Sequence, residues 1–147
     1  MKICKSFFAI VLVLVFSLPV SAAEEKPVSV RIDNQLVRFS YQLPVIIDGR
    51  VLVPVDGVFE KLGFEAYWLE AAQKVRLEGP YFYIEFGIDS AEYMIFTDIG
   101  VTIRRLDVPA QTINGHAMIP LRAAAEAIGG TTEWDEENKT ALIWRQI

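Results

Sequence analysis

The chain has 147 residues, of which 52% are hydrophobic, and it carries 14 Lys and Arg against 19 Asp and Glu. This length accommodates one domain and little else. An acidic chain without basic clusters lacks a phosphate-binding surface, which argues against nucleic acid and anionic lipid as partners.

The first 23 residues have the features of a secretory signal peptide. Lys2 and Lys5 precede an almost entirely apolar run at 6–20, and Ser21-Ala22-Ala23 supplies small residues for cleavage. The apolar run of about 15 residues is shorter than the roughly 20 that span a bilayer. We therefore expect a secreted, extracytoplasmic protein with no stable membrane span after cleavage, the alternative being a retained N-terminal anchor.

Removal of this segment would leave one domain at 24–147. This domain keeps 12 Lys and Arg against 19 Asp and Glu, a net formal charge of −7. The only cysteine, Cys4, lies in the signal peptide, so the exported domain has neither a thiol nor a disulfide. It must therefore rely on its hydrophobic core, which is feasible at this size.

An internal duplication is the most specific feature of the sequence. A shift of 66 residues aligns residues 47–77 with a second copy without a gap. The matches include Ile47-Asp48-Gly49-Arg50 with Ile113-Asn114-Gly115-His116, Pro54 with Pro120, Gly63 with Gly129, and Trp68 with Trp134. We predict internal repeats at about 28–79 and 80–147.

The first copy is predicted to contain two hairpins and a helix. After an opening hairpin (28–32 and 36–39), strands at 45–47 and 51–53 flank Asp48-Gly49, a strong signal for a tight turn. An apolar stripe at i, i+3, i+4 and i+7 then predicts a short helix from Val55 to Leu62. A second hairpin should follow at 64–69 and 75–77.

The second copy repeats this order after two central strands at 81–86 and 92–96. Strands at 111–113 and 117–119 flank Asn114-Gly115, and the same stripe predicts a helix from Leu121 to Ile128. A last hairpin is expected at 131–134 and 141–144. The predicted fold is α+β, with two pseudo-symmetric β-hairpin–helix–β-hairpin repeats whose mainly antiparallel sheet wraps around two short helices.

These motifs resemble the copper amine oxidase-like N-terminal domain family, a stalk-type domain of secreted bacterial proteins. The match runs through Asp48-Gly49-Arg50, Val53-Pro54-Val55 and Trp68, and recurs at Ile119-Pro120-Leu121-Arg122 and Trp134-Asp135. It covers essentially all of 28–144. Two departures are Asp56, where Arg122 suggests arginine, and His116 at the second hairpin tip. The resemblance implies a non-catalytic envelope module without copper chemistry.

Chemical groups for catalysis are sparse. His116 alone cannot build a Zn or Cu site, and no Cys–His or Ser–His arrangement is evident, so we expect no metal, no cofactor and no enzyme activity. The carboxylates Glu133, Asp135, Glu136 and Glu137 are best interpreted as a solvated turn. A Ca²⁺ site or a small carboxylate-based hydrolase at this cluster are the less favoured alternatives.

Aromatic and arginine side chains are the better candidates for binding. The candidate ligand-binding residues are Trp68, Trp134, Tyr81, Tyr83, Arg50 and Arg122. Tyr and Trp on a sheet face can stack on sugars or bury a partner's side chains, although both Trp could instead cap the core. We predict a cell-envelope module for binding or scaffolding, with polysaccharide, peptidoglycan or an envelope protein as partner. The alternative is a structural stalk subunit that self-associates through sheet edges.

Overall fold

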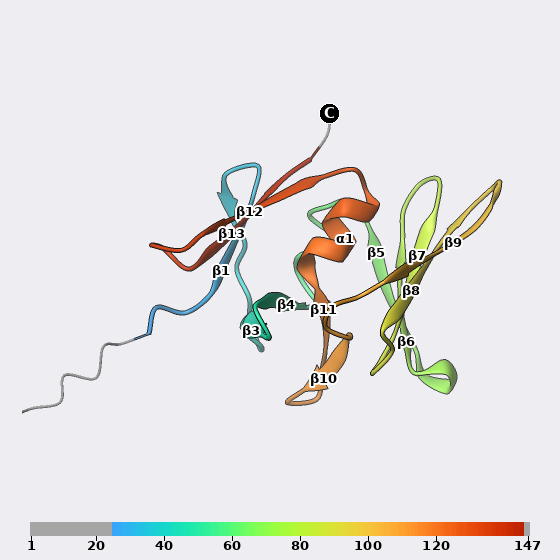
Figure 1. Cartoon of the computed structure of the whole chain (residues 1–147), viewed down its shortest axis with the longest axis horizontal. Coiled ribbons are helices and arrows are strands. Elements are labelled where there is room, and N and C mark those ends of the chain that lie inside the picture. Colours follow the sequence, from blue (N-terminus) through green and yellow to red (C-terminus); the bar gives the residue numbers. More distant parts are fainter. Residues whose placement is uncertain (1–24, 146–147) are drawn as a thin grey trace, which may run out of the picture.

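The computed structural model describes residues 25–145, so the expected signal peptide and Cys4 lie outside the described residues. Within these residues, three sheets surround a single α-helix, α1 (Leu121–Ala127), as Figure 1 shows. Among the described residues, no helix is long and apolar enough to cross a membrane.

The first sheet joins the two ends of the domain. Its strand order is β12 (Thr131–Asp135), β13 (Thr140–Trp144), β1 (Ser29–Ile32) and β2 (Gln35–Leu36). Strand β1 runs parallel to β13, with Val30 opposite Ala141, whereas the other pairs are antiparallel. The expected opening hairpin is thus present but short, because its second strand has only two residues.

The second sheet brings the two tight-turn hairpins together. Its order is β10 (Gln111–Ile113), β11 (His116–Pro120), β4 (Arg50–Pro54) and β3 (Val45–Ile47). Asp48-Gly49 and Asn114-Gly115 all have positive φ, which confirms both predicted turns. Val53 lies opposite Ile119 across the β4–β11 pair. These two residues are 66 positions apart, so the aligned hairpins meet at their equivalent positions.

The third sheet is an antiparallel meander, seen on the right of Figure 1. Its strands are β5 (Glu65–Leu69), β6 (Lys74–Glu78), β7 (Tyr83–Gly87), β8 (Glu92–Thr97) and β9 (Gly100–Arg105). A short 3₁₀ turn, η1 (Glu70–Ala72), connects β5 to β6. Strand β9 was not predicted, and it forms an edge of the sheet because it pairs only with β8.

The predicted fold class is wrong in its helices and its symmetry. The described chain is mostly β, in three sheets, and the segment 56–63 forms consecutive turns where the first helix was expected. Gly57 has φ +96°, which interrupts a right-handed helix, whereas the equivalent position in α1 is Ala123. The second hairpins also diverge, because β6 continues into β7 and β13 pairs instead with β1.

The main core lies between α1 and the sheets, and Leu52, Val108 and Met118 form a second, smaller buried cluster. The main core contains Phe59, Leu77, Ile84 and Phe86 on the side of the third sheet. From the other elements it receives Val53, Ile119, Leu121, Val30 and Ile143, all buried. Phe59 is fully buried even though its segment is irregular. Side-chain packing therefore fixes the position of 56–63 where helical hydrogen bonding does not.

Candidate functional site

A cleft with a volume of about 440 Å³ lies between three elements, and we call it pocket A. The β3–β4 hairpin forms one side, the beginning of α1 forms the second, and the β12–β13 hairpin forms the third. The charged and aromatic lining residues are Arg50, Arg122, Glu133, Trp134, Glu136 and Lys139. Val51, Leu121 and Ala141 contribute apolar surface. The cleft thus has both apolar and charged lining residues.

The indole of Trp134 is held by a carboxylate at the rim of pocket A. Its Nε1–H donates to Oε2 of Glu136 at 2.5 Å, and Lys139 forms an ion pair with the same carboxylate. The hydrogen bonds from Lys139 and from Trp134 hold the pKa of Glu136 below its ordinary value. Trp134 is half-buried and also packs against the main core, so its ring has a defined position.

Two arginines provide the positive charge on the opposite side. Arg50 donates from Nε and Nη2 to Oδ2 of Asp107, at 2.9 and 2.5 Å. Arg122 is exposed, and within residues 25–145 it has no ion pair or side-chain hydrogen bond. Its fork of donors therefore remains available for an incoming carboxylate, sulfate or phosphate.

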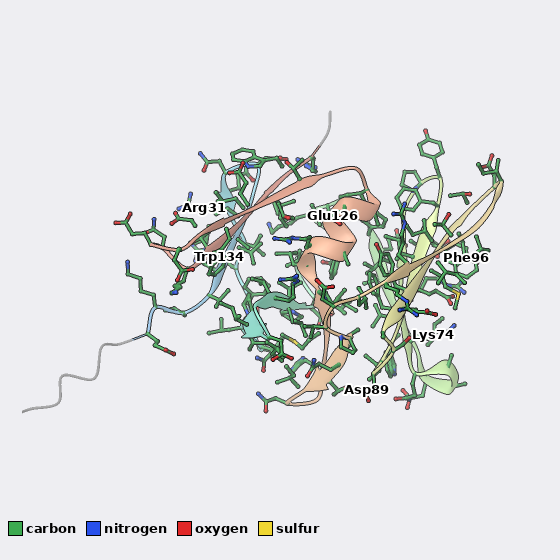
Figure 2. All side chains as sticks on the ribbon, in the orientation of Figure 1. Arg31, Lys74, Asp89, Phe96, Glu126 and Trp134 are labelled. Atoms are coloured by element: carbon green, nitrogen blue, oxygen red, sulfur yellow. The ribbon has the colours of Figure 1, made fainter. Side chains whose placement is uncertain are left out.

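The structure brings three of the six predicted binding residues together. Arg50, Arg122 and Trp134 all line pocket A. Trp68 lines a separate pocket of about 470 Å³, which we call pocket B. Figure 2 places Trp134 on the first sheet, on the far side of the molecule from Phe96 in the third sheet.

The two tyrosines are not part of either pocket. Tyr83 stacks on Phe96 with ring centroids 4.4 Å apart, and the guanidinium of Arg76 lies 4.5 Å above its ring. Tyr81 is 86% exposed in the turn before β7. Both tyrosines belong to the meander and its turns, and neither lines the pockets that contain the two tryptophans.

Three lining residues were missed as binding candidates. Glu133 and Glu136 were assigned to a solvated turn, and Lys139 was not named as a binding residue. A signal was available, because Trp134 and Glu136 repeat the spacing of Trp68 and Glu70 in the first copy. That spacing recurs as a hydrogen bond in the structure, since Trp68 also donates to Glu70.

The chemistry of pocket A favours binding over bond cleavage. Glu136 is an ion-paired carboxylate with a lowered pKa, which is the opposite of what a general acid requires. Within 25–145, no three His, Cys, Asp or Glu side chains gather in a way that could hold a metal ion. The pocket can hold an anionic group beside the ring of Trp134.

Residues 31–143 match the model of the family described as copper amine oxidase N-terminal domain. Neither a curated protein nor a solved structure matches the chain significantly. The family match covers more than three quarters of the sequence and agrees with the resemblance carried by the Gly-Arg and Pro-Leu-Arg motifs. The chain belongs to the copper amine oxidase N-terminal domain family, whose domain is a non-catalytic one.

Proposed function

We propose that this protein is an exported, non-catalytic module of the cell envelope that binds an acidic polysaccharide in pocket A. The observation that carries the proposal is the arrangement of Trp134 beside Arg50, Arg122 and Lys139 in one cleft. A sugar acid has two parts, an apolar ring face and a carboxylate. The pocket offers a partner for each part.

The ring face of the sugar would stack on the indole of Trp134. An indole is large and apolar on its face and polar at its N–H, and here the N–H is already satisfied by Glu136. Little side-chain entropy remains to be lost on binding, because the ring is already held between that hydrogen bond and the core.

The carboxylate of the sugar would bind the arginines. Arg122 can donate two parallel hydrogen bonds to it, because no other described side chain occupies its N–H groups. Arg50, oriented by Asp107, supplies a second cation at the same cleft. The protein as a whole is acidic, so its surface in general repels an anionic ligand. The cations of pocket A would therefore direct such a ligand to this cleft.

Binding to sodium polygalacturonate, with dextran as the uncharged control, tests the proposal. We expect saturable binding of polygalacturonate in isothermal titration, weakened by added salt because ion pairs contribute. Trp134→Ala and Arg122→Gln should each weaken it by about tenfold or more, the loss expected for a central contact. Arg122 is exposed, so the second variant should fold normally.

The matched control is Trp144→Ala. Trp144 lies on the neighbouring strand β13, is 39% exposed and lines neither pocket A nor pocket B. Its removal should leave the affinity unchanged. Absence of binding by the unmodified protein, or equal losses in the Trp134 and Trp144 variants, would contradict an acidic-saccharide site in pocket A.

A second candidate function is self-association through β9. All six residues of this edge strand are exposed, with Val101 at 54% and Ile103 at 60%. Such an edge is open to pairing with another chain. Antiparallel pairing of two β9 strands centred on Ile103 would place Arg104 opposite Thr102 and Arg105 opposite Val101, which avoids an Arg–Arg contact.

Sedimentation velocity tests this second candidate. The unmodified protein should show a concentration-dependent dimer, and Ile103→Lys should shift it to monomer because a lysine on the edge blocks strand addition. Ile99→Lys is the control, since Ile99 is fully exposed in the β8–β9 turn, outside the strand. A monomer at all concentrations would rule out the β9 contact, and an equal effect of both variants would indicate non-specific apolar association.

A further inference from the structure

Pocket B is the positional counterpart of pocket A. Each of the residues that line pocket B lies 66 positions from a residue that lines pocket A. It is enclosed by the β10–β11 hairpin, the chain after β4 and the β5–β6 hairpin, whereas pocket A uses β3–β4, the beginning of α1 and β12–β13. The two pockets share no lining residue.

The aromatic part of the two pockets is the same. Trp68 donates its Nε1–H to Glu70, just as Trp134 donates to Glu136. Trp68 is 43% exposed and does not belong to either core cluster. Its ring is therefore anchored at the N–H and open at its face, which is the condition for stacking on a sugar ring.

The charges of the two pockets differ. Three cationic positions of pocket A are replaced, because Arg50, Arg122 and Lys139 correspond to His116, Asp56 and Gln73. Glu133 corresponds to Tyr67, whose side chain lies on the opposite face of β5 from Trp68 and donates to Glu65. Pocket B thus contains two carboxylates, Asp56 and Glu70, and neither lysine nor arginine among its lining residues.

We propose that pocket B is a second saccharide site, specific for an uncharged sugar residue. Carboxylate and amide oxygens at Asp56 and Gln73 can accept hydrogen bonds from sugar hydroxyls, while Trp68 supplies a ring face. A sugar acid is disfavoured by the two carboxylates and finds no Lys or Arg in the lining. The ring of His116 stacks on Tyr41, with centroids 6.3 Å apart, which orients it at the pocket wall.

This inference extends the proposed function from one site to two. A module with two independent pockets of opposite preference can bind two residues of a mixed polymer, or two chains, at once. Simultaneous engagement raises the apparent affinity without any new contact, provided that the polymer spans both pockets.

A crossed titration with two tetrasaccharides tests the inference. Chitotetraose is the uncharged probe and tetragalacturonate the acidic one, and each is titrated into Trp68→Ala, Trp134→Ala and the control Trp144→Ala. We expect Trp68→Ala to weaken chitotetraose binding by about tenfold or more while leaving tetragalacturonate binding unchanged. Trp134→Ala should do the reverse. Added salt should weaken only the acidic probe.

A gain-of-function variant provides the second measurement. Asp56→Arg combined with His116→Arg places in pocket B the residue types that pocket A has at the equivalent positions. The stoichiometry of tetragalacturonate should rise from one to two per chain, and chitotetraose binding should fall. Asp56 is exposed, so this variant does not depend on a core change.

The outcomes separate this inference from the proposed function. If no protein binds tetragalacturonate, the acidic site in pocket A is overturned. If chitotetraose binding is nevertheless lost only in Trp68→Ala, pocket B is supported. Chitotetraose binding that is absent, or is unaffected by Trp68→Ala, would overturn pocket B as an uncharged-sugar site even if pocket A binds its ligand. An unchanged stoichiometry in the double variant would also count against it.

Discussion

Phe59→Ala should lower the free energy of unfolding by about 3–5 kcal/mol, the range for truncating a buried phenylalanine. Phe59 has no exposed surface and packs in the main core with Val58 and Leu62. Its segment, 56–63, is a series of turns and lacks the regular hydrogen bonding of a helix. The loss of this anchor should therefore combine a cavity with a weakened attachment of the whole segment.

Urea unfolding followed by circular dichroism measures this effect. Phe59→Leu keeps most of the volume and should cost less than about 1.5 kcal/mol. Tyr81→Ala, at a position that is 86% exposed, should remain within about 0.5 kcal/mol of the parent protein. A loss below 1 kcal/mol in Phe59→Ala, with an unchanged m-value, would contradict the role of this side chain as the anchor of 56–63.

Glu85→Gln should lower the free energy of unfolding by about 2 kcal/mol at neutral pH, as expected for lost hydrogen bonds to a charged group. Glu85 accepts from Arg76 Nε and Nη2 at 3.1 and 2.7 Å and from Lys74 Nζ at 3.1 Å. Its side chain is 8% exposed, whereas its two partners are about one-third exposed. The partners can regain water, which keeps the cost below that of a fully buried pair.

The pH dependence of this effect has a definite sign. Burial alone would raise the pKa of Glu85, but the hydrogen bonds from Arg76 and Lys74 outweigh it and hold the pKa below its ordinary value of 4.5. A lowered pKa in the folded state means that the stabilisation is complete above pH 4.5 and is lost as the pH falls through the lowered value. The difference between parent and variant should therefore be largest at neutral pH and shrink below pH 4.5.

Chemical unfolding at neutral and acidic pH measures that difference. Glu78→Gln is the control, because Glu78 is an exposed carboxylate on the same strand as Arg76 without an ion pair among residues 25–145. It should shift stability by no more than about 0.5 kcal/mol. A stability difference for Glu85→Gln that grows on acidification would contradict the assigned ion pairs.

Local turn chemistry made the tight-turn hairpins predictable from the sequence. Asp48-Gly49 and Asn114-Gly115 need positive φ at both positions, and few residue pairs other than these tolerate it. The first helix could not be predicted correctly, because the apolar stripe from Val55 to Leu62 fits a helix and also fits a packed series of turns. The positive φ of Gly57 decided between them.

Strand β9 was missed for a related reason. Val101 and Ile103 share one face of the strand, but the alternation has only these two apolar positions and all six residues are exposed. The pattern of burial that identifies a half-buried strand is therefore absent, although Val101, Thr102 and Ile103 favour strands. The strand is defined by its ladder with β8, which is a tertiary fact.

The candidate site was predictable as residue types and not as a geometry. Arg50, Arg122 and Trp134 stand out because they belong to repeated motifs, yet Arg50 lies 72 residues before Arg122 in the sequence. Strand β4 of the first copy pairs with β11 of the second copy. This pairing places the β3–β4 hairpin next to the second copy, where it lines pocket A together with β12–β13. No local pattern in either copy predicts that pairing.

The parallel pair of β1 and β13 has a mechanical consequence. Force transmitted along the chain would pull β1 from its beginning, at Ser29, and β13 from its end, at Trp144. These points lie at opposite ends of the pair, because Ser29 is opposite Thr140 and Ile32 is opposite Ile143. Tension would thus shear all of the ladder hydrogen bonds together, whereas a hairpin pulled from one end would open one bond at a time. A domain pulled from its two ends would resist extension through this short ladder.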